Sequence, residues 1–287
     1  MYNSMLNIFS LESIPDSLQK YLGKPDARVK NWMFLNTPLN LIGIYLLYAA
    51  IVLHSRQIMK NRKPFSLKYL LIMYNGFQIL FSAYICKEIF TSAYFSGYKL
   101  SCAKLDSTNN KLALRMARAF WFFYLSKVID LTDTIFFVLR KKDSQLTFLH
   151  IYHHTSMIFN WYIGVLYVPG GQAFFSAGIN SLVHVIMYTY YLLSAMGPKM
   201  QKYLWWKKYL TQIQLIQFIV VMIHMIIGYI NGCRKPKWLI CFTVIYLWTL
   251  VILFANFYFH AYKNNKLRTA HSKNRIDIKA GGDMKLE

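Results

Sequence analysis

Acidic residues are scarce in this sequence, and charge of either sign is low for a chain of this length. Of its 287 residues, 15% are charged and 56% are hydrophobic, and 33 Lys and Arg outnumber 11 Asp and Glu. A soluble domain rarely has this composition, whereas a membrane protein with several spans usually does. The net charge of +22 at pH 7 would suit a nucleic-acid-binding protein, but the basic residues lie between apolar runs and near the chain ends. Lys and Arg at those places are typical of membrane topology, so we expect no nucleic acid partner.

Cysteine is equally scarce, and the chain has no early apolar segment. Its four cysteines lack zinc-finger spacing, which argues against a zinc site. Residues 1–36 are polar and mixed in charge, without the apolar core of a secretory signal peptide. We therefore expect the first membrane span to act as an uncleaved anchor.

Long apolar runs, by contrast, are frequent. A bilayer core about 30 Å thick requires about 20 apolar residues in a helix. Seven stretches qualify: residues 38–54, 65–90, 118–139, 146–168, 172–195, 209–230 and 238–260. The sequence therefore predicts an all-α polytopic membrane protein with seven transmembrane helices in residues 37–262. Lys and Arg favour one set of loops, which places the basic, disordered tail (263–287) in the cytosol and the N-terminal segment (1–36) outside or in a lumen.

The most informative stretch is residues 145–160, QLTFLHIYHHTSMIFN. It carries His150, His153 and His154 near the start of the fourth predicted span. Their i, i+3, i+4 spacing puts the three imidazoles on one helical face. Ionisable side chains at membrane depth are costly and usually mark function. The cluster therefore predicts a functional site.

Polar residues of four predicted spans lie at similar depth, if each helix rises about 1.5 Å per residue. Each set follows one helical face. The sets are Lys127, Asp130, Asp133 and Thr134; His150, His153 and His154; His184, Tyr188 and Tyr191; and Gln214 and Gln217. This convergence predicts a hydrated cavity in the cytosolic half of the helix bundle.

Some of these residues have a structural alternative. Lys127 and Asp130 can form a buried ion pair that only holds helices together. Gln214 and Gln217 can serve as interhelical hydrogen bonds. The remaining histidines are interpreted as structural or interfacial: His54, His224, His260 and His271.

The histidine cluster suits two kinds of chemistry. One histidine-rich segment offers too few ligands for a di-iron centre, but His150, His153 and a carboxylate can hold a single metal. Alternatively, a partly desolvated imidazole stays neutral and acts as nucleophile or base without a metal. We favour the second interpretation and predict no metal.

At these residues the chain resembles the ELO family of very-long-chain fatty acid elongases, the condensing enzymes of the endoplasmic reticulum. The resemblance spans about residues 36–262 and rests on four motifs in order. Residues 127–134, KVIDLTDT, resemble the family motif K-x-x-E-x-x-D-T, and residues 145–154, QLTFLHIYHH, resemble its extended histidine box. Residues 180–191, NSLVHVIMYTYY, resemble N-x-x-x-H-x-x-M-Y-x-Y-Y, and residues 211–217, TQIQLIQ, resemble T-x-x-Q-x-x-Q. The histidine box and residues 202–208, KYLWWKK, most resemble the polyunsaturated and very-long-chain branch. One departure is Asp130, where the family usually has Glu, which shortens the reach of the carboxylate by a methylene.

The resemblance implies that a long-chain acyl-CoA condenses with malonyl-CoA to a 3-ketoacyl-CoA, releasing CO₂ and CoA, without a cofactor. His153 would be the nucleophile that forms an acyl-imidazole. The other implied catalytic residues are His150, His154, His184, Lys127, Asp130 and Asp133, and the implied substrate-binding residues are Asn180, Tyr188, Tyr191, Gln214, Gln217, Lys207 and Lys208. Lys207 and Lys208 would contact CoA phosphates, or else are ordinary positive-inside residues.

The resemblance also implies an inverted barrel of six helices around a substrate tunnel, in the membrane of the endoplasmic reticulum. The implied partners are membrane lipids, the two CoA substrates, the other enzymes of the elongation cycle and a second copy of the chain. The alternative from another class is a seven-helix transporter or receptor that uses the buried Lys, Asp and His residues.

The predicted membrane topology leads to one further prediction. Cys102 and Cys233 both fall in loops assigned to the lumen, which is oxidising, so we expect them to form a disulfide. Cys86 and Cys241 lie in predicted spans and are interpreted as apolar residues.

Overall fold

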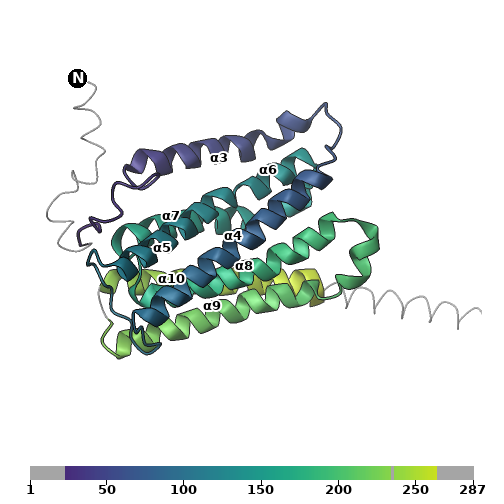
Figure 1. The fold of residues 1–287 in the computed structure, drawn as a ribbon. Helices are drawn as coiled ribbons and strands as arrows, with labels where there is room; N and C mark the ends of the chain where they lie inside the picture. Colours follow the sequence, from purple (N-terminus) through teal and green to yellow (C-terminus); the bar gives the residue numbers. More distant parts are fainter. Residues whose placement is uncertain (1–22, 234–235, 264–287) are drawn as a thin grey trace, which may run out of the picture.

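The computed structural model describes residues 23–233 and 236–263, so residues 1–22 and nearly all of the predicted basic tail lie outside the described residues. Every regular element in these ranges is helical, and they contain no strand. The α-helices, labelled in Figure 1, are α3 (Pro38–Met59), α4 (Lys68–Phe95), α5 (Lys111–Ile129), α6 (Thr132–Leu139), α7 (Phe148–Tyr167), α8 (Phe174–Ala195), α9 (Lys207–Ile230) and α10 (Lys237–Tyr258). Short helical turns are η2 (Asp143–Gln145), η3 (Gly171–Ala173), η4 (Pro198–Tyr203) and η5 (Phe259–Lys263). All-α architecture is therefore confirmed for the described residues.

Side-chain caps fix where several helices begin. The Thr37 hydroxyl accepts a hydrogen bond from the Leu39 amide, and Pro38 fills the first position of α3. Thr147 caps α7 in the same way, through the amide of His150. The second cap fixes the first turn of α7, which is the turn that carries the histidines.

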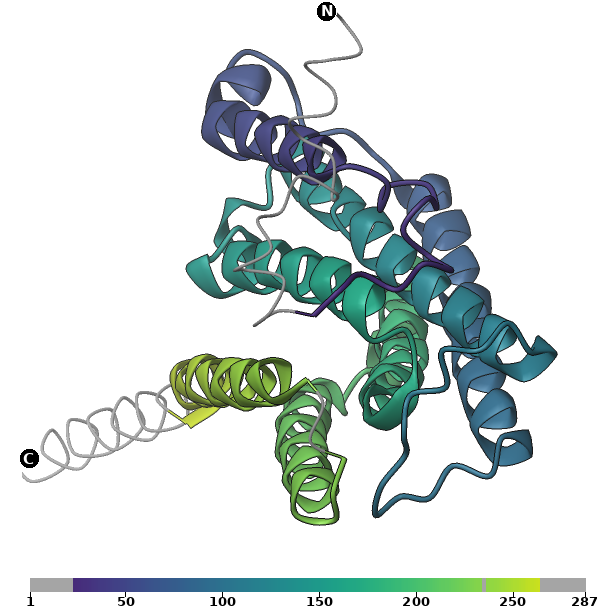
Figure 2. The same ribbon diagram turned by 90° about the vertical axis from the view of Figure 1, so that its left-hand side faces the viewer.

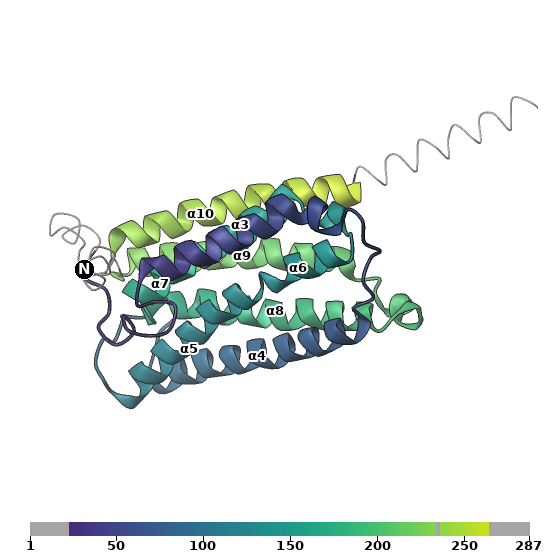
Figure 3. The ribbon, with the colours of Figure 1, turned by 90° about the horizontal axis from the view of Figure 1, so that it is seen from above.

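The long helices run side by side (Figures 1 and 3). Helix α4 packs against α5 and α8, α8 against α9, α9 against α10, α10 against α7, and α7 against α5. Helix α3 lies at the periphery and packs mainly on α6 and α7, far from α9 (Figure 2). Four helices with polar faces, α5 to α8, are thus neighbours in the middle of the bundle.

Four helical segments are long and apolar enough to cross a membrane: Pro38–Ser55, Lys68–Phe95, Lys207–Ile230 and Lys237–Tyr262. They correspond to the first, second, sixth and seventh predicted spans. The third, fourth and fifth predicted spans are also helical, but they contain the charged and histidine-rich segments of the chain. These four segments agree with a multi-pass membrane protein.

The predicted third span, residues 118–139, is not one continuous helix. α5 ends at Ile129, and α6 begins at Thr132 after a tight turn at Asp130 and Leu131. In that turn the Leu131 amide bonds the carbonyl of Val128 at 3.3 Å, and the Asp133 amide bonds that of Asp130 at 3.1 Å. These are i to i−3 bonds of the 3₁₀ type, which often mark a functional segment when they interrupt a helix.

Two apolar clusters hold the helices together. The larger one joins α4, α5, α7 and α8 around the fully buried Phe120, Phe123 and Ile158. The second joins α9 and α10 around Val221 and Leu250. Because the two clusters are separate, the interior between them is free to contain a cavity.

Candidate functional site

The site begins at the break between α5 and α6, where Lys127 and Asp130 meet. Lys127 Nζ lies 3.4 Å from Asp130 Oδ2, and the two side chains are only 3% and 4% exposed. His184 on α8 joins them: its Nε2 lies 3.3 Å from Lys127 Nζ, and its Nδ1 lies 3.7 Å from Asp130 Oδ2. Lys127 Nζ also lies 4.6 Å from the centre of the Phe123 ring. A lysine and a carboxylate of the third predicted span and an imidazole of the fifth are thus in direct contact.

The second carboxylate is tied to the first by a tyrosine. The Tyr188 hydroxyl on α8 lies 2.9 Å from Asp130 Oδ1 and 3.1 Å from Asp133 Oδ2. One phenol hydrogen is therefore shared between two buried carboxyl groups. Tyr191, one turn further along α8, contacts the Tyr188 ring at 5.9 Å between centroids.

Sequence reasoning missed Gln78, which completes this network from α4. Its Nε2 donates to Asp130 Oδ1 at 2.6 Å and lies 3.1 Å from the Tyr188 hydroxyl, and the side chain is 1% exposed. A signal was present, since Asn75, Gln78 and Ser82 form an i, i+3, i+7 polar stripe on an otherwise apolar helix. The name "charge network" is used below for Gln78, Lys127, Asp130, Asp133, His184 and Tyr188.

The three clustered histidines lie beside this charge network on the first turns of α7. The rings of His150 and His154 are 4.3 Å apart, and those of His153 and His154 are 5.5 Å apart, between centroids. His153 lies next to Phe254 of α10, at 5.7 Å between ring centroids. Oγ1 of Thr134, the residue after Asp133, lies 2.8 Å from Nε2 of His150 and joins the cluster to the helix of the charge network. Imidazoles and charge network therefore form one continuous polar region.

His150 is held by a partner from the charged helix. Its Nε2 lies 2.8 Å from Oγ1 of Thr134, which is fully buried on α6. The backbone amide of His150 donates to the capping Thr147. Both contacts fix the position of this ring relative to α6.

The remaining predicted binding residues are divided. Asn180 and Gln217 are buried, and Oδ1 of Asn180 and Oε1 of Gln217 have no hydrogen-bond partner. Gln214 donates to the Met187 sulfur at 3.7 Å, away from the charge network. Lys207 and Lys208 are exposed at the start of α9, where Lys208 covers the Tyr209 ring.

A cavity of about 1190 Å³ lies among α7, α8, α9 and α10. Its lining is largely apolar and includes Trp161, Gly164, Val221 and Leu250. Of the predicted site residues, only Asn180 and Gln217 line it. This apolar volume is therefore distinct from the hydrated cavity predicted among the polar stripes, which stays a prediction.

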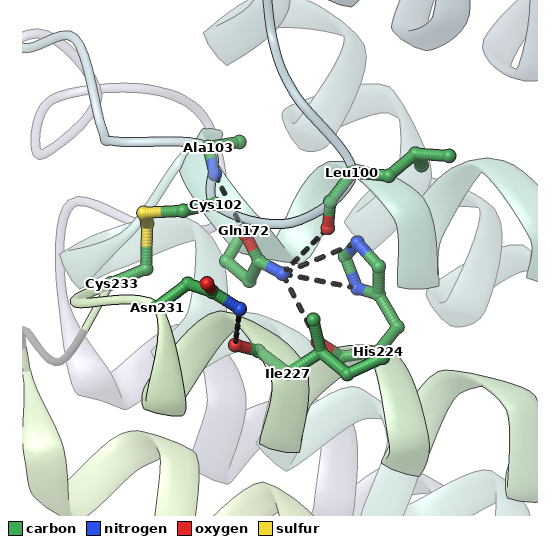
Figure 4. Close-up of a disulfide and its surroundings, with 8 residues drawn as sticks. All are labelled: Leu100, Cys102, Ala103, Gln172, His224, Ile227, Asn231 and Cys233. Atoms are coloured by element: carbon green, nitrogen blue, oxygen red, sulfur yellow. Dashed lines mark hydrogen bonds between the residues drawn. A yellow bond between two sulfur atoms is a disulfide. The ribbon is translucent and has the colours of Figure 1, made fainter.

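The loop between α4 and α5 lines part of this cavity. The structure contains the predicted disulfide at this loop. Cys102 and Cys233, 131 residues apart, are bonded with a Cα–Cα distance of 5.5 Å (Figure 4). Ala103 and Cys233 line the cavity. The other two cysteines, Cys86 and Cys241, are free thiols.

A second residue that sequence reasoning missed, Gln172, fastens the same loop (Figure 4). Its Oε1 accepts from the Ala103 amide at 2.8 Å, and its Nε2 donates to the carbonyl of His224 at 3.1 Å. His224 is buried against Phe175, with ring centroids 4.4 Å apart. His224 therefore belongs to the contact between this loop and α9.

No group of three or more His, Cys, Asp or Glu residues in ranges 23–233 and 236–263 is arranged as a set of metal ligands. The donors of the site bond to one another instead.

The fold and the site define this protein as a helical membrane protein with a buried Lys–Asp–His network beside a histidine cluster. A sequence profile of the GNS1/SUR4 family matches residues 33–270, so the chain belongs to this family. It is 41% identical over 287 residues to very long chain fatty acid elongase 4 of Homo sapiens, covering 99% of this chain and 91% of that protein. It is 43% identical to the Mus musculus protein of that name, covering 91% and 84%. It is also 43% identical to very long chain fatty acid elongase 7 of Rattus norvegicus, covering 83% and 85%.

Proposed function

We propose that this protein catalyses the first step of fatty acid elongation. A long-chain acyl-CoA condenses with malonyl-CoA to give a 3-ketoacyl-CoA, CO₂ and CoA. One observation carries the proposal: a buried Lys127–Asp130–His184 contact lies beside three imidazoles. Family membership and an apolar cavity large enough for an acyl chain support it. A seven-helix transporter or receptor is not favoured, because the named relatives are fatty acid elongases.

The reaction proceeds in two steps on His153. Its neutral imidazole nitrogen attacks the thioester carbonyl, the C–S bond breaks, and the imidazole proton leaves with CoA as the thiol. Malonyl-CoA then loses CO₂, and the resulting carbanion attacks the acyl-imidazole carbonyl. The C–N bond breaks, and the imidazole takes up one proton from solvent. A partly desolvated histidine suits both steps, because burial keeps it neutral and nucleophilic.

The neighbouring groups orient this chemistry. His150 and His154 fix the position of the nucleophile, and His184 handles the malonyl unit with help from the buried cation Lys127. The amide oxygens of Asn180 and Gln217 line the cavity without partners, so a bound substrate or water can satisfy them. Tyr188 and Tyr191 bind substrate from the side of the charge network, outside the apolar cavity. Gln214, Lys207 and Lys208 bind the CoA moiety, the two lysines as point charges for phosphates.

The helix neighbours support a proposal for the membrane arrangement. All seven apolar segments span the bilayer, and α4, α5, α7, α10, α9 and α8 close into a ring in that order, because each packs on the next. The acyl chain occupies the cavity inside this inverted barrel. The N-terminus and the disulfide face the lumen of the endoplasmic reticulum, and the C-terminus faces the cytosol. Partners are membrane lipids, the other enzymes of the cycle and a second copy of this chain.

The test is a turnover assay with purified protein. Labelled malonyl-CoA and a panel of acyl-CoAs are added, and CO₂ release and ketoacyl product are measured. We expect His153→Ala to lower the rate by at least about a hundredfold, since it removes the nucleophile. His54→Ala is the control, because His54 is exposed and its ring hydrogen-bonds to Gln57 on the same helix, away from the site. Full condensation by His153→Ala would refute the nucleophile assignment, and no condensation by the unaltered protein would refute the reaction.

A further inference from the structure

Helix α3 is mostly exposed, yet it buries one hydroxyl group against the helices that carry the site. Leu46 and Leu47 are 67% and 66% exposed, whereas the adjacent Tyr48 is 4% exposed. α3 packs mainly on α6 and α7. A phenol buried at this contact needs a hydrogen-bond partner, because an unsatisfied buried hydroxyl is unfavourable.

That partner is Thr134 on α6. The Tyr48 hydroxyl lies 3.0 Å from Thr134 Oγ1, and the same oxygen lies 2.8 Å from Nε2 of His150. The His150 ring lies 4.3 Å from that of His154, between centroids. A continuous line of contacts therefore runs from the peripheral helix to the histidine cluster.

We propose that Tyr48 is a positioning residue for the histidine cluster: its hydroxyl donates to Thr134, and Thr134 donates to Nε2 of His150. A phenol is more acidic than an aliphatic alcohol and hence the better donor. A threonine hydroxyl has one hydrogen and two lone pairs, so once it accepts from Tyr48 its own hydrogen is available to the imidazole.

The consequence is a defined tautomer. A neutral imidazole carries one N–H, so His150 accepts at Nε2 and holds its proton on Nδ1. Thr134 on its own can equally turn its hydrogen away and accept from the ring. By donating to Thr134, Tyr48 disfavours that second arrangement, in which the Thr134 oxygen would accept two hydrogen bonds, and it does so from a helix that otherwise only borders the bundle. The inference rests on the proposed function, because it gives Tyr48 a part in the reaction of this cluster.

The chain contains a matched control for this role. Tyr45 lies one turn earlier on α3, and its hydroxyl donates to the carbonyl of Thr155 on α7 at 2.7 Å. Tyr45→Phe therefore removes one phenol hydrogen bond between α3 and the bundle without removing any contact to an imidazole. A role of Tyr48 in anchoring α3 alone would make the two variants equivalent.

The experiment compares Tyr48→Phe and Tyr45→Phe in the full-length protein, with kcat and KM measured for acyl-CoA and for malonyl-CoA. We expect Tyr48→Phe to lower kcat by about five- to tenfold, the effect of one hydrogen bond, with both KM values unchanged. Tyr45→Phe should keep kcat within about twofold of the unaltered protein, because the bond it loses does not reach the imidazoles. Thermal unfolding of both variants checks that each is folded.

Thr134 variants test the direction of the relay. Thr134→Ser keeps the hydroxyl and should keep most of the activity, whereas Thr134→Val should lower kcat at least as much as Tyr48→Phe. On the Thr134→Val background, Tyr48→Phe should have no further effect, since residues acting through one contact are not additive.

Equal kcat values for the two tyrosine variants, or additive losses in the double variant, would overturn the role of Tyr48. A lack of condensation by the unaltered protein would instead refute the proposed function. The two failures are therefore distinguishable in one set of measurements.

Discussion

Replacing Lys127 by Met tests whether the buried ion pair is a structural or a chemical device. The side chain keeps its length and its packing on Phe123, but Asp130 loses the cation 3.4 Å away. Both partners are at most 4% exposed, so solvent does not screen the loss. Asp130 keeps the donors Gln78 and Tyr188 on Oδ1, while Oδ2 retains only the neighbouring His184.

Removing one partner of a buried ion pair costs about 3–5 kcal/mol, because it leaves an uncompensated charge. In a domain of 150–250 residues each kcal/mol lowers the Tm by about 2–4 °C, so we expect a drop of roughly 6–20 °C for Lys127→Met. Asp130→Asn should have a similar effect, because it leaves the lysine unpaired. The double variant should recover most of the lost stability, since replacing a buried pair by neutral groups is often nearly neutral.

The assay is thermal unfolding in detergent, followed by intrinsic tryptophan fluorescence, in parallel with the condensation rate. We expect the double variant to be folded and inactive. Neither side chain then carries an unpaired charge, so the fold is stable, but the ammonium and carboxylate that the reaction requires are both missing. A loss below about 1 kcal/mol for Lys127→Met, or additive losses in the double variant, would refute the reasoning about the buried pair. Restored activity together with restored stability would show that the pair is only structural.

Three further results are expected elsewhere in the chain. Cys102→Ser opens a loop of 131 residues and should destabilise the protein by about 5 kcal/mol in the chain-entropy treatment, seen as a lower Tm and as separated fragments on a non-reducing gel after nicking. Gly228→Ala places a Cβ against the side chain of Gln172 and should cost about 1–3 kcal/mol, whereas Gly43→Ala meets nothing within 4 Å and should leave the Tm unchanged. Gly164→Leu projects into the cavity and should shorten the acyl chains accepted, measured by chromatography of the products; unaltered chain lengths would argue against this cavity as the acyl site.

The helical segments and the convergence of polar residues could be predicted because both depend on spacing along the chain alone. Imidazoles at positions i, i+3 and i+4 lie on one face of their helix, regardless of which helix packs against it. The depth of Lys127 and His184 follows from the rise per residue. The disulfide followed from loop assignment, since the predicted topology puts both cysteines in loops on one side of the membrane.

Contacts that depend on helix rotation and neighbours could not be predicted. Gln78 completes the charge network because α4 packs on α8, and no spacing in the sequence states that pairing. Tyr48 is one of two tyrosines on an apolar helix, and only the contact of α3 with α6 distinguishes it from Tyr45. The position of the cavity was missed for the same reason. Whether apolar faces of α9 and α10 fill the interior depends on how far apart the helices lie.

The helix break at Asp130 explains how one short side chain serves four partners. Asp disfavours helix interiors and is favoured at turns, so it suits the end of α5 better than a longer Glu would. The tight turn lets the carboxylate face three helices at once. Its Oδ1 accepts from α4 and α8 through Gln78 and Tyr188, and its Oδ2 faces Lys127 on its own helix. The carboxylate is therefore the point at which α4, α5 and α8 contact one another beside the histidine cluster.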